Sequence, residues 1–252
     1  MSIITIHQQQ FDVDCIIFDK DDTLVKFDAI WLSRTHKWVE AIATNLSLNS
    51  TFMYELFDLL GYSPTPPGLR AESPLAIATM DTLNTLAAGV ICRYGFPWHE
   101  ARLQAEICAQ NTMNANFTTE EIIPIGNPRR AMEQLARANI RIGIVTSDNR
   151  AMTEATLAYL GIADFISAMV CGDDSLPSKP APEAFWEIAR QLEIAPQRMM
   201  MVGDTISDMQ FAINADAAYR IGVASHSNNI LALSAHADAI ITSIDEIIAE
   251  GG

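Results

Sequence analysis

Residues 16–24 read IIFDKDDTL, an apolar run that ends abruptly in three carboxylates and a hydroxyl. Carboxylates gathered at the end of a buried strand are costly unless a positive group is bound beside them, because a partly dry site disfavours like charges. Asp19 and Asp21 lie two residues apart, so in an extended segment their side chains share one face. The stretch therefore predicts a buried strand that ends at a site for a divalent cation, with room for a phosphate beside it.

The composition excludes several classes of protein. The chain has 252 residues, of which 49% are hydrophobic, and this is enough for a large core that carries a sizeable insertion. Its formal net charge of -15 argues against a nucleic-acid partner, because phosphate backbones are bound by an excess of Lys and Arg. The charge is more typical of a solvated acidic surface.

Neither a membrane segment nor a metal-binding cysteine motif is evident. No segment approaches the roughly 18 apolar residues that cross a bilayer, and the amino terminus has no basic stretch followed by an apolar run. The cysteines lack the CxxC spacing of zinc and redox sites and are expected to be free thiols, mostly buried. They are Cys15, Cys92, Cys108 and Cys171. We expect a cytoplasmic protein without a membrane partner, and the sequence does not set its oligomeric state.

Short apolar runs typical of buried strands recur along the chain. They cover residues 13–18, 140–145, 168–171, 199–202, 219–223 and, more weakly, 239–242. Helical patterns lie between them, at residues 128–138, 150–160, 182–192 and 207–215. Strands that alternate with helices predict parallel crossovers. We therefore expect an α/β fold with a doubly wound, Rossmann-like parallel sheet, which binds ligands beyond the carboxyl ends of its strands.

Residues 27–119 interrupt this alternation, because they show helical periodicity and no convincing strand. The Pro- and Gly-rich segment at residues 61–74 is predicted to be a loop within them. We expect an inserted all-helical cap domain over residues 27–119. The catalytic core would then consist of residues 1–26 and 120–252.

Polar residues follow several of the predicted strands in clusters. The clusters are Asp19, Asp21 and Thr23; Thr146 and Ser147; Lys179; and Asp204 with Asp208. Each cluster alone has an ordinary explanation, such as a solvated turn, a helix cap or a surface lysine. Together they occupy matching positions at the ends of separate strands, so coincidence explains them poorly.

These clusters resemble the motifs of the haloacid dehalogenase superfamily of phosphotransferases, in the branch with a helical cap inserted after the first motif. Residues 19–23 match its DxDxT motif, Thr146 its hydroxyl motif, Lys179 its lysine motif and residues 203–208 its GDxxxD motif. The resemblance covers residues 11–26 and about 120–245. The strings FDKDDTL, VTSD, KPAPEAF and VGDTISDM most resemble phosphoglycolate phosphatase-like enzymes.

One position departs from the family pattern, because Asp22 stands where the family usually has Gly. A glycine there indicates a tight turn with a positive φ. Aspartate is among the few other residues that accept this conformation, so we expect the turn to persist. The additional negative charge lies near the expected anion site and would oppose substrate binding.

The resemblance implies a Mg²⁺-dependent phosphatase that hydrolyses a small phosphorylated metabolite through an aspartyl-phosphate. Asp19 would be the nucleophile, and Asp21 would protonate the leaving oxygen and later deprotonate water. The implied metal site comprises Asp19, the backbone carbonyl of Asp21, Asp204 and, less directly, Asp208. The implied phosphate-binding residues are Thr23, Thr146, Ser147 and Lys179, of which Lys179 would also neutralise Asp19.

Other activities stay open at this point. A phosphosugar mutase of the same superfamily would use the same residues, and cap closure would decide between the two reactions. A phosphoaccepting switch or a non-catalytic metabolite-binding protein are alternatives from other classes. Specificity would depend on the cap, where each basic residue is expected to be solvated and the tryptophans to belong to the cap core. These residues are Lys37, Arg70, Arg93, Arg102, Trp31 and Trp38.

Overall fold

A computed structural model of the chain describes residues 2–70, 72–113, 121–224 and 230–249. The chain divides into two compact units. Met1–Lys26 and Ile122–Gly252 form the first, here termed the core unit, and Phe27–Glu121 form the second, the helical unit. The domain boundary predicted at residues 119 and 120 lies outside the described residues.

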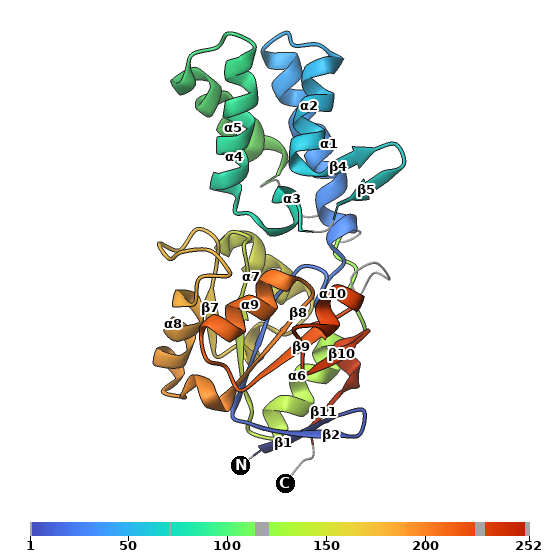
Figure 1. The fold of residues 1–252 in the computed structure, drawn as a ribbon, viewed down its shortest axis with the longest axis vertical. Coiled ribbons are helices and arrows are strands. Elements are labelled where there is room, and N and C mark those ends of the chain that lie inside the picture. The colour runs from blue at the N-terminus through green and yellow to red at the C-terminus, as the bar shows by residue number, and fades with distance from the viewer. Residues whose placement is uncertain (1, 71, 114–120, 225–229, 250–252) are drawn as a thin grey trace. The chain divides into compact units, whose positions relative to one another are not determined.

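The central sheet of the core unit has six parallel strands in the order β10-β9-β8-β3-β6-β7 (Figure 1). Its strands are β3 (Cys15–Phe18), β6 (Arg141–Val145), β7 (Ala168–Val170), β8 (Met199–Gly203), β9 (Tyr219–Val223) and β10 (Ala239–Ile241). Phe18, the last residue of β3, lies opposite Val202 on β8 and Ile144 on β6. The residues that follow these three strands therefore emerge at one edge of the sheet. This confirms the predicted doubly wound parallel sheet.

Helices pack on both faces of this sheet. Successive side chains of β3 accordingly point into two different hydrophobic clusters. Ile16 packs in a cluster with Met132 of α6, and Ile17 packs in another with Phe185 of α8 and Phe211 of α9. The helices of the described core unit are α6 (Pro128–Arg137), α7 (Arg150–Tyr159), α8 (Glu183–Leu192), α9 (Ile206–Asn214) and α10 (Ile230–Ser234). Short 3₁₀ turns cover Ala163–Phe165, Pro196–Arg198 and Ile244–Glu246.

A second sheet in the core unit was not predicted. It is antiparallel, in the order β11-β1-β2, and consists of β1 (Ser2–Ile6), β2 (Gln9–Val13) and β11 (Ile247–Ala249). The prediction of one strand over residues 13–18 is wrong, because the chain bends at Asp14 between β2 and β3. The Asp14 carboxylate accepts two hydrogen bonds of 2.8 Å from the Arg198 guanidinium. Because Arg198 pairs with Asp14 at this bend, a single apolar run interrupted by a carboxylate supplies strands to both sheets.

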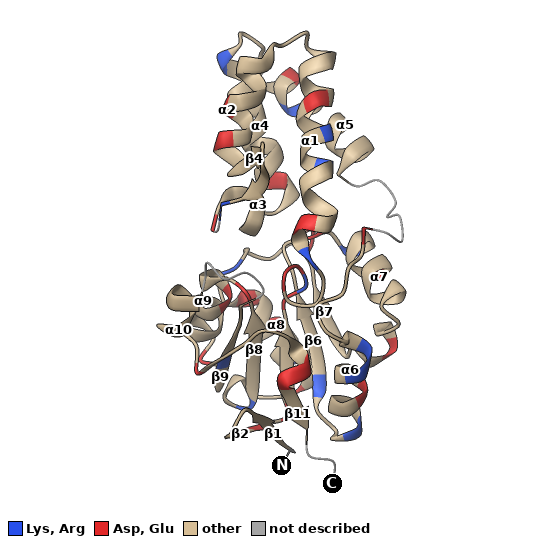
Figure 2. Ribbon diagram, turned by 90° about the vertical axis from the view of Figure 1, so that its right-hand side faces the viewer, with Lys and Arg blue, Asp and Glu red and all other residues tan. Residues whose placement is uncertain are grey.

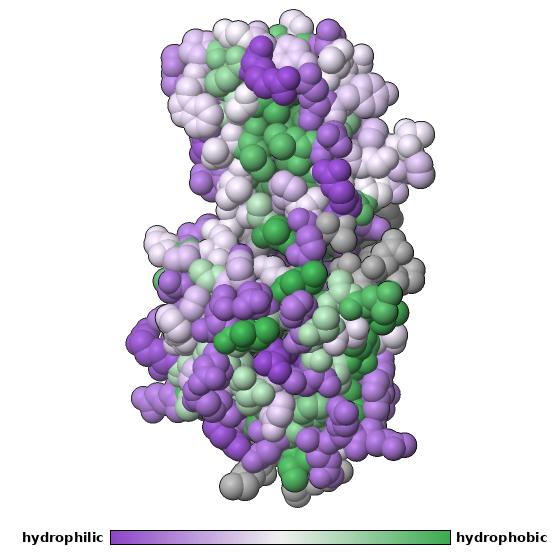
Figure 3. All heavy atoms as spheres, in the orientation of Figure 1, coloured by the Kyte–Doolittle hydropathy of each residue, from purple (hydrophilic) through white to green (hydrophobic). Residues whose placement is uncertain are grey.

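The helical unit consists of α1 (Phe27–Asn45), α2 (Ser50–Leu60), α3 (Pro74–Ile77), α4 (Met80–Arg93) and α5 (Trp98–Thr112), together with a hairpin. The hairpin joins β4 (Tyr62–Pro64) to β5 (Pro67–Leu69), so the predicted loop over residues 61–74 contains two short strands and the expectation of an all-helical insertion is wrong there. Gly61, with a φ of 80°, ends α2 and reverses the chain, and the prolines occupy the hairpin ends and its turn. Figure 3 shows apolar residues gathered on the visible face of this unit, between α2 and α4.

Buried aromatic residues hold the helical unit together. Trp31 and Trp38 are both buried, and the Trp38 indole donates to the Ala105 carbonyl at 3.0 Å. Their interpretation as core residues of the insertion is confirmed. The four cysteines are free, as expected. Cys92 is partly exposed, and the other three are buried.

The hydropathy of the helices and the distribution of charged residues agree with the composition. In the described part of the chain, no helix combines the length and apolar character that crossing a bilayer requires. Figure 2 shows Lys and Arg scattered among Asp and Glu along the ribbon.

Candidate active site

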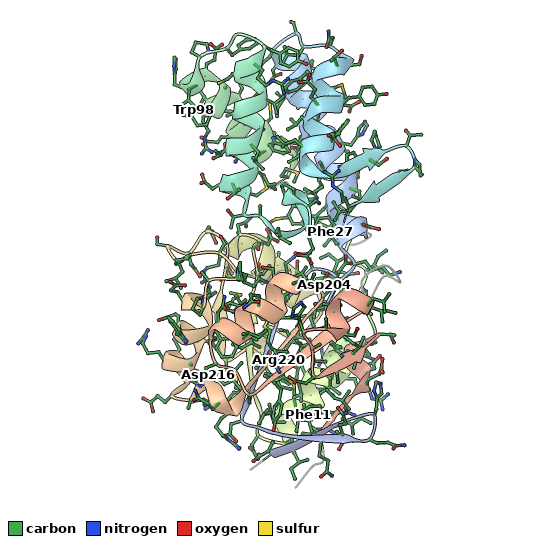
Figure 4. The ribbon with its side chains drawn as sticks, viewed as in Figure 1. Phe11, Phe27, Trp98, Asp204, Asp216 and Arg220 are labelled. Atoms are coloured by element: carbon green, nitrogen blue, oxygen red, sulfur yellow. The ribbon has the colours of Figure 1, made fainter. Side chains whose placement is uncertain are left out.

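Three neighbouring strands deliver polar residues to one edge of the central sheet. Asp19 follows β3, Thr146 follows β6, and Asp204 follows Gly203 at the end of β8. The Asp19 amide donates to the Val202 carbonyl at 2.9 Å, so pairing with β8 continues to the acidic residue. Figure 4 labels Asp204 just beyond β8, and Phe11 towards the other end of the core unit.

Lys179 joins two of these motifs. Its ammonium group lies 2.6 Å from Asp19 Oδ1 and 2.6 Å from Asp208 Oδ1. It also lies 3.4 Å from the Val145 carbonyl at the end of β6. Burial alone would lower the pKa of Lys179, but the two carboxylates raise it above its usual range. The lysine is therefore a fixed positive charge beside Asp19.

Asp208 holds Lys179 from the first turn of α9. Thr205 and Asp208 form a capping box, in which Asp208 Oδ2 accepts hydrogen bonds from the Thr205 amide at 3.1 Å and its hydroxyl at 2.6 Å. The other carboxylate oxygen accepts from Lys179. Both oxygens of Asp208 are thus engaged, which favours support of Lys179 over direct coordination of a metal.

Asp19 and Asp204 are two carboxyl groups of the site whose pKa values are raised by their surroundings. Burial raises the pKa of Asp19 to about 7, while Lys179 opposes the rise and Asp208 adds to it. Burial also raises the pKa of Asp204 well above its usual range, and the nearby Asp19, Asp208 and Asp22 raise it further. Two carboxyl groups that disfavour ionisation in each other's presence become compatible once a cation lies between them.

No sequence pattern used above predicted the burial of Lys20, the second lysine of the site. Lys20 is fully buried, with its ammonium group 2.7 Å from Asp21 Oδ2 and 3.2 Å from Asp148 Oδ2. Burial would lower the pKa of Lys20, yet the two carboxylates raise it above its usual range. A lysine between two aspartates at the end of an apolar strand was the available signal, since such a charge is buried only with partners.

The hydroxyl residues differ in their surroundings. Thr146 is buried, and its Oγ1 accepts from the Asp148 amide at 3.2 Å, which leaves its own proton for another acceptor. Ser147 next to it is partly exposed. Thr23 is fully buried, and its hydroxyl has no hydrogen-bond partner among the described residues. The structure places the first two at the strand edge, whereas Thr23 lies in the buried turn after β3.

The turn after β3 has the predicted conformation. Asp22 has a φ of 54°, in the left-handed region that favours glycine. Its amide donates to the Val25 carbonyl at 2.7 Å. The expectation that aspartate preserves this tight turn is confirmed.

Comparison with known proteins agrees with this arrangement. A family model described as haloacid dehalogenase-like hydrolase matches residues 13–216, which include all four motifs. The chain belongs to this family.

Two curated relatives of this haloacid dehalogenase-like protein carry different activity names. A phosphoglycolate phosphatase of Nitrosococcus oceani is 30% identical over 42% of the chain and 48% of its own length. Pyrophosphatase PpaX of Oceanobacillus iheyensis is 31% identical over 46% of the chain and 55% of its own length. The chain thus spans about half the length of these relatives.

The fold is shared with solved structures over nearly the whole chain. A HAD hydrolase of family IA, variant 3, from Entamoeba histolytica has a TM-score of 0.66 and 18% sequence identity. The match covers 93% of this chain and 95% of that one. At this level of identity the similarity concerns the fold alone.

The donor set of the haloacid dehalogenase-like protein fits a hard divalent cation. No group of three or more His, Cys, Asp and Glu side chains is arranged as a metal site within the described residues. Mg²⁺ needs fewer side chains, because it retains several waters. The ion would be held by Asp19, Asp204 and the backbone carbonyl of Asp21. The Asp21 side chain would not take part, since its carboxylate is paired with Lys20. The raised pKa values of Asp19 and Asp204 support this set.

Most of the basic residues of the helical unit have carboxylate partners within that unit. Arg102 lies 2.9 Å from Asp81, Arg70 lies 3.5 Å from Asp58, and Arg93 lies 3.6 Å from Glu55. Lys37 is exposed on α1. These contacts agree with the interpretation of Lys37, Arg70 and Arg93 as surface charges, whereas the Arg102 side chain is only 21% exposed.

Proposed function

We propose that this haloacid dehalogenase-like protein is a Mg²⁺-dependent phosphatase that hydrolyses a small phosphate monoester. One observation carries the proposal: Lys179 bridges Asp19 and Asp208, residues from three separate segments of the chain. A buried ammonium held beside a carboxylate at the end of a parallel sheet suits a site where phosphoryl oxygens bring additional negative charge. Asp204 and the hydroxyl of Thr146 border the same edge.

Asp19 would begin the reaction by attacking phosphorus. A bond forms between a carboxylate oxygen of Asp19 and phosphorus, and the bond between phosphorus and the ester oxygen breaks. Asp21, in its protonated form, would give a proton to that oxygen, and the product alcohol would leave. Asp21, now a carboxylate, would take a proton from water as the water oxygen attacks phosphorus. Inorganic phosphate and the free Asp19 carboxylate would result.

Electrostatic stabilisation would come from the groups around Asp19. Lys179 and the Thr146 hydroxyl would contact the phosphoryl oxygens, with Ser147 and Thr23 as further candidates in the same motifs. When bound, Mg²⁺ would supply charge neutralisation for the phosphoryl group. Each contribution is larger in a site from which water is partly excluded.

Phosphoglycolate is the first substrate to test. The relative from Nitrosococcus oceani bears the name phosphoglycolate phosphatase, and PpaX bears the name pyrophosphatase. Both names denote hydrolysis of a small phosphorylated compound. Asp22 adds a negative charge near the site, which makes a singly phosphorylated substrate more favourable than a highly charged one.

A phosphate-release screen tests the proposal. Purified protein with Mg²⁺ would be assayed on phosphoglycolate, pyrophosphate, a panel of sugar phosphates and 4-nitrophenyl phosphate. We expect release from at least one small ester, and none above background from Asp19→Asn. Acid-quenched reactions with a ³²P-labelled ester should trap a labelled protein at Asp19.

Two results would contradict the proposal. Absence of phosphate release from every ester by the wild-type protein would remove the hydrolase assignment. Conversion of one sugar phosphate into an isomer, with no net release of phosphate, would indicate a mutase instead.

A further inference from the structure

Lys20 is the least expected feature of the site. It follows Asp19 directly, occupies one of the two positions that the DxDxT motif leaves unspecified, and ranks among the largest fully buried side chains of the described residues. A buried ammonium is strongly destabilising unless carboxylates surround it. The presence of Lys20 at this position therefore requires dedicated partners, and those partners indicate what it does.

The partners of Lys20 connect two loops. The ammonium lies between Asp21 of the turn after β3 and Asp148 of the loop after β6, at 2.7 and 3.2 Å. Asp148 is itself fixed, because its Oδ1 accepts from the Asn149 amide at 2.7 Å. Asn149 in turn caps α7 by accepting from the Met152 amide at 2.9 Å. The Asp21 carboxylate is thus tied through Lys20 to the start of a helix.

This arrangement is separate from the Lys179 group. Lys179 pairs with Asp19 and Asp208, whereas Lys20 pairs with Asp21 and Asp148. The two aspartates of the motif, only two residues apart, are therefore held by different lysines from different directions. Each of the two carboxylates therefore has a lysine of its own as partner.

We propose that Lys20 and Asp148 are positioning residues, which hold the Asp21 carboxyl group in the orientation needed to protonate the leaving group. The inference rests on the proposed phosphatase activity. A fixed carboxylate matters most when the leaving group is a poor one, because an alkoxide must be protonated as it departs. A dinitrophenolate departs without that proton, so its release is insensitive to the position of Asp21.

The test compares two esters in Lys20→Met. The quantity measured is kcat/KM, which reports on the steps up to phosphoryl transfer to Asp19 and not on the later hydrolysis. We expect kcat/KM for an alkyl phosphate to fall on the order of 100-fold, the range for loss of general acid catalysis. For 2,4-dinitrophenyl phosphate we expect kcat/KM to stay close to wild type. Lys26→Met, an exposed lysine outside the site, is the matched control.

A double-mutant cycle separates positioning from general damage. Asp21→Asn should show the same selectivity between esters, and Lys20→Met with Asp21→Asn should be no worse than Asp21→Asn alone. If Lys20→Met does not fold, as judged by circular dichroism, Asp148→Asn gives the same comparison with the lysine retained. We expect it to lower kcat/KM for the alkyl ester selectively.

The outcomes are distinct. An equal loss of kcat/KM for both esters, or no loss for either, would overturn the positioning role while leaving the phosphatase proposal intact. If the losses of kcat/KM for the alkyl ester from Lys20→Met and Asp21→Asn were fully additive in free energy, the positioning role would be overturned as well. A wild-type protein that hydrolyses neither ester would overturn both the proposed function and this inference.

Discussion

Among single residues, the site depends on two lysines with different partners, of which Lys20 is fully buried and Lys179 has a side chain that is 9% exposed. Each would be unfavourable alone, and each is stabilised by two carboxylates within 3.2 Å. Lys179 leaves Asp19 with a neutralising neighbour, and Lys20 restrains Asp21. Because the two lysines pair with different carboxylates, substitution of each lysine tests a different pair of contacts.

Lys179→Met should reduce phosphate release by about 100-fold to 1000-fold, the usual cost of losing one stabilising donor at a developing charge. The variant leaves Asp19 and Asp208 without their cation, so folding stability should also decline. Steady-state kinetics and thermal unfolding measure the two effects. Lys37→Met, at an exposed position, should change neither. Wild-type kcat in Lys179→Met would refute the assigned role.

Asp22→Asn should strengthen substrate binding. Asparagine accepts the left-handed conformation found at this position, so the substitution removes charge without disturbing the turn. The Asp22 charge reaches the site, because it contributes to the raised pKa of Asp204. We expect KM to fall by about fivefold, equivalent to roughly 1 kcal/mol for one charge at this distance.

Asp216 provides a matched control for that measurement. It also has a positive φ, of 59°, and Figure 4 labels it away from Asp204 within the core unit. Asp216→Asn should leave KM unchanged. An equal change of KM in both variants would show that general surface charge, not the charge of Asp22, controls affinity.

At the scale of secondary-structure elements, the close approach of β8 and α9 requires a glycine. A Cβ atom at Gly203 would lie 2.5 Å from Asp208 Cγ and 2.6 Å from its Cβ. Such contacts do not occur without displacement of α9 or of the Asp208 side chain. The glycine of the GDxxxD motif is therefore a packing requirement that keeps Asp208 within reach of Lys179.

Gly203→Ala should destabilise the protein by about 1–3 kcal/mol, the usual cost of overpacking, and should also reduce activity. Gly89→Ala is the contrasting variant, because Gly89 is exposed in α4 with open space around it. There alanine should stabilise the helix by about 0.5–1 kcal/mol. Thermal unfolding monitored by circular dichroism measures both. Equal melting temperatures for the two variants would contradict the packing argument.

At the scale of the whole molecule, the net charge of -15 is unfavourable at the site unless a cation is bound. Carboxyl groups with a raised pKa stabilise the fold while protonated, and this contribution is lost as the pH rises through the folded-state pKa. For Asp19 that value is about 7, and for Asp204 the direction is the same. The metal-free protein should therefore carry a local electrostatic penalty at pH 8.

Removal and return of Mg²⁺ should reveal this penalty without any enzyme assay. We expect Mg²⁺ to raise the melting temperature of protein treated with a chelator at pH 8, because it binds the folded state. Asp204→Asn should melt no lower than the metal-free wild type, since one unfavourable charge is gone, and should not respond to Mg²⁺. An equal response of both proteins would place the cation elsewhere.

Local sequence patterns were sufficient to predict the parallel sheet, the order of the four motifs and the left-handed turn at Asp22. These follow from local rules, because apolar runs, helix periodicity and the few residues that accept a positive φ are all visible within short segments. The carboxyl ends of parallel strands meet at one edge, so the convergence of Asp19, Thr146 and Asp204 also followed from topology.

The resemblance implied that Lys179 neutralises Asp19, but the pairing of Lys179 with Asp208 and of Lys20 with Asp21 and Asp148 emerged from the folded structure alone. The partners of Lys20 and Lys179 lie as many as 160 residues away along the chain, and pairing depends on side-chain directions that no local pattern encodes. For the same reason, the sheet formed by β1, β2 and β11 was missed, since β11 lies at the opposite end of the sequence from its partner β1. Burial, which turns Lys20 from an ordinary surface charge into part of the site, is a property of the folded chain.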